Sequence, residues 1–398
     1  MRGSVLIFGG GPLQISLIIN VKKMGYHAIV IDPDFNAVGS KVADLFIKVE
    51  GDDFDKTLNI AIENKINGIV TTATDKPILM MCRIAKILNL PFPSYESCEI
   101  LLNKTRFKQF LENNNMPFAK GYEFRSPKKT IPSNLAFPVI IKPVMNSGSR
   151  GVIKCNGILE FQNKIEETIK HCENKGYLIE EYIQGDEISV EALVQGNKIH
   201  IIQITDKIVS APPYNVELGH IQPSRYEYLR PAIERLLQDI VDKLNLNNCA
   251  LHPEMKVYNN RLTLIEIGPR LGGDFITSHL VPLSTGINIE KQLINITLGK
   301  MIRIRPNKAA SMVFFLNLPI NSIISKTISK SEIIEKFPAV KEFKLDLMPG
   351  DQIKPITNSL NRYGHVILAG KDVQTLLSYK EIIEGFLINH LTNDKLRK

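Results

Sequence analysis

The strongest constraint on the fold comes from the first thirty residues, where two apolar runs flank a glycine turn and an amphipathic segment. Residues 4–8 (SVLIF) and 28–32 (AIVID) have the β-branched, apolar character of buried strands, and residues 13–24 show the period of a helix. Gly9 to Gly11 supply the turn after the first run. This succession of strand, glycine turn, helix and strand predicts a parallel sheet flanked by helices.

The alternation continues along the next sixty residues. A helix is expected near 54–64, a strand at 68–72 (GIVTT) and a helix from about 77 to 88. The first domain then ends near Pro91 to Pro93.

The pattern of charged and apolar residues changes after this boundary. Residues 96–114 form a charged segment of helical period, and Pro117 follows where a helix should have stopped. Residues 117–194 have the pattern of a separate α+β lobe. The elements expected after the 96–114 helix are strands at 118–124, 137–142, 151–155, 177–183, 187–194 and 199–205, helices at about 158–172 and 226–243, a Pro- and Gly-rich loop at 211–223, a hairpin of residues 250–257 and 261–267 around Asn259-Asn260, strands near 311–317 and 364–369, and a final helix at about 371–391.

Composition argues against several classes of protein. The 398 residues, 44% of them hydrophobic, suffice for two or three domains. The net charge of +8 comes from Lys and Arg residues scattered singly or in pairs, which argues against a nucleic-acid partner and suits anionic small substrates. The five cysteines form no C-x-x-C pair, and Gly9 to Pro12 interrupt the apolar run at 4–21. We therefore expect a cytoplasmic protein without a disulfide framework or a membrane partner.

Two carboxylates are predicted to face each other in the hairpin. His252, Glu254 and Lys256 share one face of its first strand at period two, and Glu266 lies on the second strand. Mg²⁺ is usually held by one or two carboxylates together with substrate phosphates, so such a pair would suffice. Two solvated strand glutamates would give the same pattern.

The hairpin leads into a loop that suits a phosphate. Residues 267–274 (IGPRLGGD) place Arg270 between backbone-flexible residues just past the strand end. A guanidinium can fork onto a phosphate, and Gly272 and Gly273 let the backbone approach a ligand closely. A simple loop punctuated by glycine is the alternative.

A second phosphate-facing segment is expected upstream. Lys142 ends an apolar strand shortly before residues 146–151 (NSGSRG), whose small residues and hydroxyls can cradle a phosphate. The run lacks the P-loop signature, and a flexible hairpin turn explains it equally. Lys104, on the 96–114 helix, is by itself an ordinary solvated lysine.

Two further polar stretches are candidates for a binding site. Within residues 177–191 (YLIEEYIQGDEISVE), strand backbone can read an adenine edge while a carboxylate accepts from ribose hydroxyls, although a surface strand would carry the same charges. Glu217 and His220 offer an acid and an imidazole in a region too polar for a core.

Taken in order, these motifs resemble the ATP-grasp superfamily over essentially the whole chain, and more closely its carboxylate–amine ligases that act on amino acids. The order of the segments carries the resemblance. They are Lys104 before the lid, FPVIIKP with Lys142, NSGSRGV, LIEEYIQGDEISVE, HPEMKV, LIEIGPRLGGDFITSHL, and RYGHVILAG at 362–370.

The resemblance assigns roles to individual residues. Those implied for ATP are Lys104, Lys142, Ser147, Gly148, Ser149, Glu180, Glu181, Ile183 and Glu187. Those implied for Mg²⁺, which Mn²⁺ can replace, are Glu254 and Glu266. Those implied for catalysis are Arg270 and Lys142, and those implied for the acceptor pocket are Glu217, His220 and Asp274. Many members have asparagine as a third metal ligand where this chain has Gly268.

The resemblance also implies the architecture and the reaction. An N-terminal Rossmann-like parallel-sheet domain (1–93) would precede an ATP-grasp domain (94–300) with a lid lobe at about 117–185, and a mixed C-terminal lobe (301–398) would complete the ligase. The expected activity is ATP-dependent amide formation between small carboxylate and amine substrates, amino acids above all, through an acyl phosphate. A homodimer would fit the family.

Three other functions remain alternatives. One is an ATP-grasp carboxylase that uses bicarbonate, and another is a binding module without catalysis. The third is an NAD-dependent oxidoreductase on the first domain, although Gly9-x-Gly11-x-x-Gln14 lacks the third glycine of a dinucleotide fingerprint.

Overall fold

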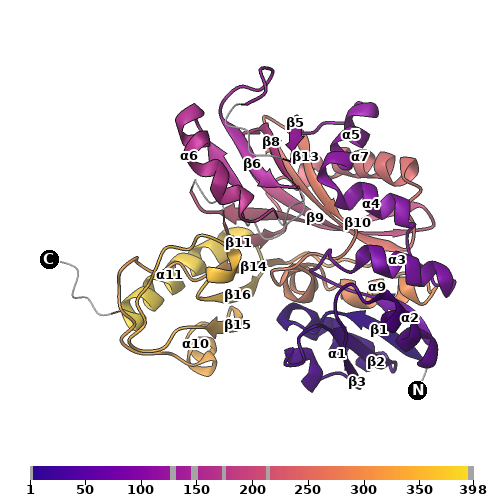
Figure 1. Ribbon diagram of the computed structural model, residues 1–398. Coiled ribbons are helices and arrows are strands. Elements are labelled where there is room, and N and C mark those ends of the chain that lie inside the picture. The colour runs from indigo at the N-terminus through magenta and orange to yellow at the C-terminus, as the bar shows by residue number, and fades with distance from the viewer. Residues whose placement is uncertain (1–2, 126–130, 145–150, 173–175, 212–215, 393–398) are drawn as a thin grey trace.

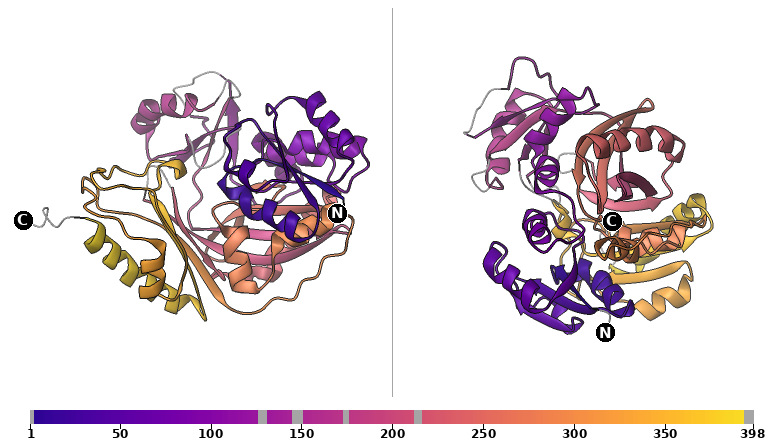
Figure 2. Two further views of the ribbon diagram at one scale, coloured as in Figure 1. Left: turned by 90° about the horizontal axis from the view of Figure 1, so that it is seen from below. Right: turned by 90° about the vertical axis from the view of Figure 1, so that its right-hand side faces the viewer.

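The computed structural model describes residues 3–125, 131–144, 151–172, 176–211 and 216–392. These residues build three sheets: a small parallel sheet, a small antiparallel lid and a large eight-stranded sheet that extends into the C-terminal lobe (Figure 1). In the right-hand view of Figure 2, the parallel-sheet domain and the lid both lie on the same side of the large sheet. The predicted mixed α/β and α+β architecture is therefore confirmed.

The N-terminal sheet is parallel, as the glycine turn predicted, with the order β3-β2-β1-β4. Its strands are β1 (Ser4–Phe8), β2 (His27–Asp32), β3 (Leu45–Lys48) and β4 (Ile66–Val70), and its helices are α1 (Ile15–Lys23), α2 (Phe54–Glu63) and α3 (Ile78–Ile87). Strand β3 was not predicted, because it is a four-residue edge strand without a fully buried side chain.

The segment predicted as a single helix at 96–114 is two helices, so that prediction was wrong. Helix α4 (Tyr95–Leu102) stops at Asn103, whose backbone is extended, and α5 (Lys104–Asn113) begins at once. The Asn103 side chain accepts hydrogen bonds from the amides of Thr105 and Arg106, which is the geometry of an N-cap. This break places Lys104 on the first turn of a new helix.

The lid is an antiparallel sheet with one covering helix. Its order is β5-β8-β6-β7, and apolar side chains of α6 and of the sheet form its core. The elements are β5 (Gly121–Phe124), β6 (Val139–Pro143), β7 (Ile153–Cys155), α6 (Ile158–Ile169) and β8 (Tyr177–Glu181).

The large sheet has the order β13-β12-β9-β10-β11-β14-β16-β15. Its strands are β9 (Asp186–Gln195), β10 (Lys198–Val209), β11 (Glu217–Gln222), β12 (Cys249–Tyr258), β13 (Arg261–Gly268), β14 (Ala310–Phe315), β15 (Val340–Leu345) and β16 (Gly364–Gly370). Strand β11 corrects the prediction of a loop over 211–223: its polar residues pair with β10 and β14 in the interior of the sheet. The prolines and the glycine of that stretch are typical of loops, which is why the strand was not predicted.

Alternation along β9 gives the large sheet two unlike faces. Ile188, Val190 and Ala192 point into an apolar core that the helix α7 (Arg230–Lys243) covers. Glu187 and Glu191, at odd positions of the same strand, therefore point to the opposite face.

The remaining helices are α8 (Val281–Thr285), α9 (Ile289–Thr297), α10 (Lys330–Lys336) and α11 (Val373–Leu391).

Two further observations bear on the expectations from composition. All five cysteines are buried and free of disulfide bonds. Among the described residues, no helix combines the length and the apolar character that crossing a membrane requires.

Candidate active site

The two hairpin glutamates are direct cross-strand partners. Glu254 on β12 is paired in register with Glu266 on β13, and a register shift follows immediately after Glu254. The hairpin turn at Asn259 and Asn260 has positive φ at both residues, as an Asn-Asn turn favours. The turn and the register shift together bring two carboxylates onto one face at the edge of the sheet, the face that β9 makes polar.

Each carboxylate of this pair faces an ammonium group. Lys104 Nζ lies 3.1 Å from Glu266 Oε2, and Lys207 Nζ lies 2.9 Å from Glu254 Oε2. Burial alone would lower the pKa of Lys104, but Glu266 raises it above its usual value. Lys104 is therefore a charged group at the hairpin and not a solvated lysine.

Lys207, on β10, is the residue at the centre of the site that the sequence did not reveal. Its side chain is 4% exposed, and its Nζ lies 3.1 Å from Glu217 and 3.9 Å from Glu187 in addition to its contact with Glu254. Burial opposes its charge, yet these carboxylates hold the pKa of Lys207 well above its usual range. The available signal was a charged pair, Asp206 and Lys207, that lies between the apolar residues Ile204 and Ile208.

Glu254 shows the complementary effect. Burial alone would raise the pKa of its carboxyl group, but Lys207 and His252 hold that pKa well below its usual range. Both Glu254 and Lys207 are therefore ionised at neutral pH.

The lid contributes a second buried ion cluster. Lys142 on β6 lies 2.6 Å from Glu180 on β8, and Lys108 of α5 lies 2.7 Å from the other oxygen of the same carboxylate. Lys108 also donates to the carbonyl oxygen of Ala119 at 2.6 Å. Glu180 is thus the internal counter-ion of Lys142, one of the lysines assigned to the phosphates.

The run assigned to adenine and ribose begins at this cluster. The amides of Glu181 and Tyr182 donate to the carbonyl oxygens of Lys120 and Pro138, so these two donors serve the lid itself. Ile183 lies beyond the end of β8. Glu187, at the start of β9, pairs with its cross-strand partner Lys256 at 3.1 Å.

Ser147, Gly148 and Ser149 lie outside the described residues, which resume at Gly151.

Arg270 connects the hairpin to the N-terminal domain. Its guanidinium donates in a bidentate manner to Asp75, at 2.8 Å from Nε and 3.1 Å from a terminal nitrogen. The amide of Ala73 donates to the carbonyl oxygen of Leu271, which joins the same two segments through their backbones. Asp75, 195 residues before Arg270 in the chain, was not predicted from the sequence.

The three residues assigned to the acceptor pocket are gathered around one arginine. Arg362 donates to both oxygens of Asp274, at 2.6 and 2.7 Å, and His220 Nε2 lies 3.4 Å from Asp274. Ser359 donates to Glu217 at 3.1 Å, and Arg362 donates to the Glu217 carbonyl oxygen at 3.3 Å. Burial opposes ionisation of Asp274, but Arg362 and His220 lower the pKa of its carboxyl group. The C-terminal lobe therefore completes this part of the site.

The site fits a magnesium ion that phosphates help to hold. Among the described residues, no group of three or more His, Cys, Asp and Glu side chains is arranged to hold a metal ion. The Glu254 and Glu266 carboxylates can supply two oxygens, which is a common protein share when substrate phosphates complete the coordination. Gly268 offers no side-chain ligand.

The glycine turn of the N-terminal domain is occupied by the protein's own side chains. Gln14 stands where a dinucleotide fingerprint would have its third glycine, and its amide nitrogen donates to the carbonyl oxygen of Thr72 at 2.7 Å. The Gln14 side chain packs beside Gly9 and Gly11. Asp32 accepts from the Gly10 amide at 2.7 Å. A dinucleotide pyrophosphate would meet a carboxylate at this turn.

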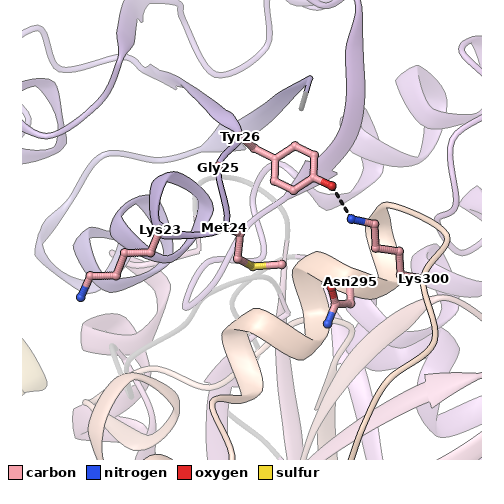
Figure 3. Close-up of a pocket in the computed structure, with 6 residues that line it drawn as sticks. All are labelled: Lys23, Met24, Gly25, Tyr26, Asn295 and Lys300. Atoms are coloured by element: carbon pink, nitrogen blue, oxygen red, sulfur yellow. Dashed lines mark hydrogen bonds between the residues drawn. The ribbon is translucent and has the colours of Figure 1, made fainter. Parts of the chain in front are cut away.

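A hollow of about 400 Å³ lies away from this site, between the end of α1 and the end of α9 (Figure 3). Tyr26 borders it just before β2 begins, so it opens at the amino ends of the parallel strands, whereas Asp32 and Thr72 mark their carboxyl ends. Lys300 donates to the Tyr26 hydroxyl, while Lys23 points away from this pair. None of the residues that line the hollow belongs to the ion clusters described above.

Comparison with known proteins places this site in a family. Residues 135–278 match the model of an ATP-grasp domain, and residues 326–381 match that of the L-amino acid ligase C-terminal domain 2. The carbamoyl phosphate synthase large chain of Clostridium acetobutylicum is 24% identical over 332 residues. That match covers 75% of this chain but only 29% of its relative.

Two solved structures share the fold over nearly the whole chain. The L-amino acid ligase from Bacillus licheniformis is 19% identical with a TM-score of 0.80, and the alignment covers 98% of each chain. N5-carboxyaminoimidazole synthetase from Staphylococcus aureus, complexed with ADP, is 17% identical with a TM-score of 0.74, and the alignment covers 96% of this chain and 97% of that one. With both domain matches in the expected order, the chain carries an ATP-grasp domain followed by an L-amino acid ligase C-terminal domain, as the resemblance implied.

Proposed function

We propose that this protein is an ATP-dependent ligase that joins the carboxylate of one amino acid to the amine of another through an acyl phosphate. The observation that carries the proposal is the face of the large sheet where Glu254 and Glu266 lie opposite each other, each beside a lysine. The match of the C-terminal lobe to an L-amino acid ligase domain supports amino acids as substrates. A protein of similar fold that was crystallised with ADP supports the choice of nucleotide.

The proposed chemistry has two steps. An oxygen of the substrate carboxylate attacks the γ-phosphorus of ATP, the bond to the bridging oxygen breaks, and ADP leaves with that oxygen. The amine nitrogen of the second substrate then attacks the acyl carbon, phosphate leaves with the former carboxylate oxygen, and the nitrogen loses a proton. Such transfers depend on in-line positioning and on relief of negative charge, with no need for a covalent nucleophile on the protein.

Positive charge on the protein side would come from Lys104, Lys142 and Arg270. When bound at Glu254 and Glu266, Mg²⁺ would neutralise phosphate oxygens. In the structure, Lys104 and Lys142 rest against Glu266 and Glu180, and Arg270 rests against an aspartate. Nucleotide and metal together would replace these internal partners, because phosphates take the cations as the metal takes the hairpin carboxylates. We therefore expect nucleotide and metal to bind with positive coupling.

The amine is proposed to bind beside Glu217, His220 and Asp274. Two carboxylates suit the ammonium group of an incoming amino acid. His220 is buried, its Nε2 is turned to Asp274, and its Nδ1 has no hydrogen-bond partner within the described residues. That nitrogen is itself buried, and Arg362 holds Asp274 in place.

The direct test is a screen of ADP and phosphate release with amino acids singly and in pairs, followed by mass spectrometry of the products. The proposal expects ADP formation that depends on amino acids and yields an amide. ADP formation that depends on bicarbonate would indicate an ATP-grasp carboxylase instead. ADP production that stays at background with the whole panel would favour a non-catalytic binding module.

A variant of one hairpin carboxylate tests the site itself. Glu266→Gln removes the charge that would hold the metal while keeping the side-chain shape, so we expect ATP binding with loss of phosphate release. Glu160→Gln is a matched control, since Glu160 forms a partly exposed i,i+4 pair with Lys164 in the lid. Wild-type turnover by Glu266→Gln would refute the metal assignment.

A further inference from the structure

A glutamate and a histidine form a buried pair behind the hairpin. Glu191 on β9 is 0% exposed, so its carboxylate is held entirely inside the protein. Its Oε1 lies 2.5 Å from His252 Nδ1, and its Oε2 accepts from the amide of Gly272 at 3.1 Å. Burying a carboxylate is costly unless charged or polar partners satisfy it, and here both oxygens are satisfied.

His252 continues this chain of contacts toward the proposed metal site. It lies on β12 two residues before Glu254, on the same face of the strand, and its Nε2 is 3.4 Å from Glu254 Oε1. The His252 imidazole therefore lies between two carboxylates, the buried one of Glu191 and the partly exposed one of Glu254. The orientation of Glu254 depends on this ring and on Lys207, which bonds its other oxygen.

Gly272 lies directly against the same pair. A Cβ atom on Gly272 would approach Glu191 Oε1 to 2.5 Å and His252 Nδ1 to 2.7 Å, so a larger residue would force this pair to shift. The turn that carries Arg270 is thus packed on the pair and hydrogen-bonded to it. This close approach explains the glycine at 272, where φ is not in the positive region.

We propose that Glu191 and His252 are positioning residues that hold Glu254 and the Arg270 turn at a fixed separation. The inference rests on the proposed function, because it takes Glu254 as a metal ligand and Arg270 as a phosphate ligand. The pair connects the two halves of the site through atoms that touch neither ATP nor the metal. Partners of this kind, which orient a ligand, typically change metal affinity by about 10- to 100-fold when they are removed.

Two substitutions of one residue separate this role from simple filling of space. In His252→Asn the amide nitrogen reaches the position of Nδ1, so the bond to Glu191 is kept and the one to Glu254 is lost. In His252→Gln the amide nitrogen reaches the position of Nε2, so the bond to Glu254 is kept. We expect His252→Asn to weaken metal binding by about tenfold or more and His252→Gln to weaken it much less.

The experiment is a titration of Mn²⁺ into the full chain with ATP, with the free ion measured by its electron paramagnetic resonance signal and the Mn²⁺ bound by the same ATP without protein subtracted. Melting temperatures show whether each variant is folded, and Glu191→Gln, which keeps the shape of the side chain, provides a second perturbation of the pair. A selective loss of Mn²⁺ affinity in His252→Asn supports the proposal. If His252→Asn is unfolded, weaker Mn²⁺ binding by Glu191→Gln supports it and unchanged binding overturns it.

The results that would contradict the positioning role differ from those that would contradict the proposed function. Mn²⁺ binding by His252→Asn within twofold of wild type, or equal losses in the Asn and Gln variants, would overturn the positioning role while leaving the proposed function intact. Wild-type protein that binds no Mn²⁺ in the presence of ATP would overturn the proposed function itself, and the positioning role with it.

Discussion

Replacing Lys207 by methionine should destabilise the protein without metal and make it responsive to metal alone. The Lys207 ammonium lies within 3.1 Å of Glu254 and Glu217 and is 4% exposed, whereas these two partners are 24% and 16% exposed. Removing one member of a buried ion pair costs about 3–5 kcal/mol, because the other charge is left uncompensated. The partial exposure of both glutamates favours the lower end, about 3 kcal/mol.

The expected loss translates into a shift that thermal unfolding can resolve. At about 2–4 °C per kcal/mol for a unit of 150–250 residues, the melting temperature of Lys207→Met should fall by roughly 6–12 °C. Mg²⁺ without nucleotide should recover part of this fall, since the freed carboxylates attract a divalent cation, and it should leave wild type nearly unchanged.

A matched control uses a lysine pair on the surface. Lys164→Met removes the partner of Glu160 in an i,i+4 pair on α6, for which we expect a loss below about 0.5 kcal/mol. The reasoning would be refuted if Lys207→Met melted within about 2 °C of wild type, or if Mg²⁺ raised the melting temperature of both proteins equally.

Three further predictions concern buried groups. Burial lowers the pKa of His365 to about 4 from 6.5, so the unfolded chain binds the extra proton more readily than the folded protein. The free energy of unfolding should therefore fall by up to about 3 kcal/mol as the pH drops from 6.5 to 4. Urea titrations at each pH should show that His365→Leu removes this fall. Burial raises the pKa of Glu290, so the folded protein favours its neutral form, which is lost as the pH rises. Because glutamine stays neutral, Glu290→Gln should raise the melting temperature more at pH 8 than at pH 5. Asp75→Asn removes the counter-ion of a guanidinium that is 12% exposed, so the melting temperature without nucleotide should fall, and ATP, whose phosphates would replace that carboxylate, should recover part of the fall.

Local patterns in the sequence predicted those parts of the fold that local forces determine. The first strand, glycine turn, helix and second strand were read correctly, because strand and helix periods differ and glycine marks the turn. The facing of Glu254 and Glu266 depends in addition on the register shift after Glu254, because the register set at the turn would place Ile265 opposite Glu254. By contrast, the break at Asn103 depends on a side-chain cap that competes with continuation of the helix.

The remaining parts of the site depend on contacts between segments far apart in the chain. Lys207 reaches Glu254 because β10 and β12 both pair with β9, an order that residue spacing does not reveal. Asp75 meets Arg270 only when the N-terminal domain packs on the large sheet, and Arg362 meets Asp274 only when the C-terminal strands extend that sheet. Such charges look solvated in the sequence because their partners are not adjacent.

The most direct test of the account follows oxygen from substrate to phosphate. A mixture of amino acids labelled with ¹⁸O in their carboxylates would be incubated with the protein, ATP and Mg²⁺, and the released phosphate analysed by mass spectrometry. An acyl phosphate requires one labelled oxygen to leave with each phosphate, so the account predicts singly labelled phosphate together with ADP. Unlabelled phosphate from amino-acid-dependent turnover, or AMP in place of ADP, would contradict it.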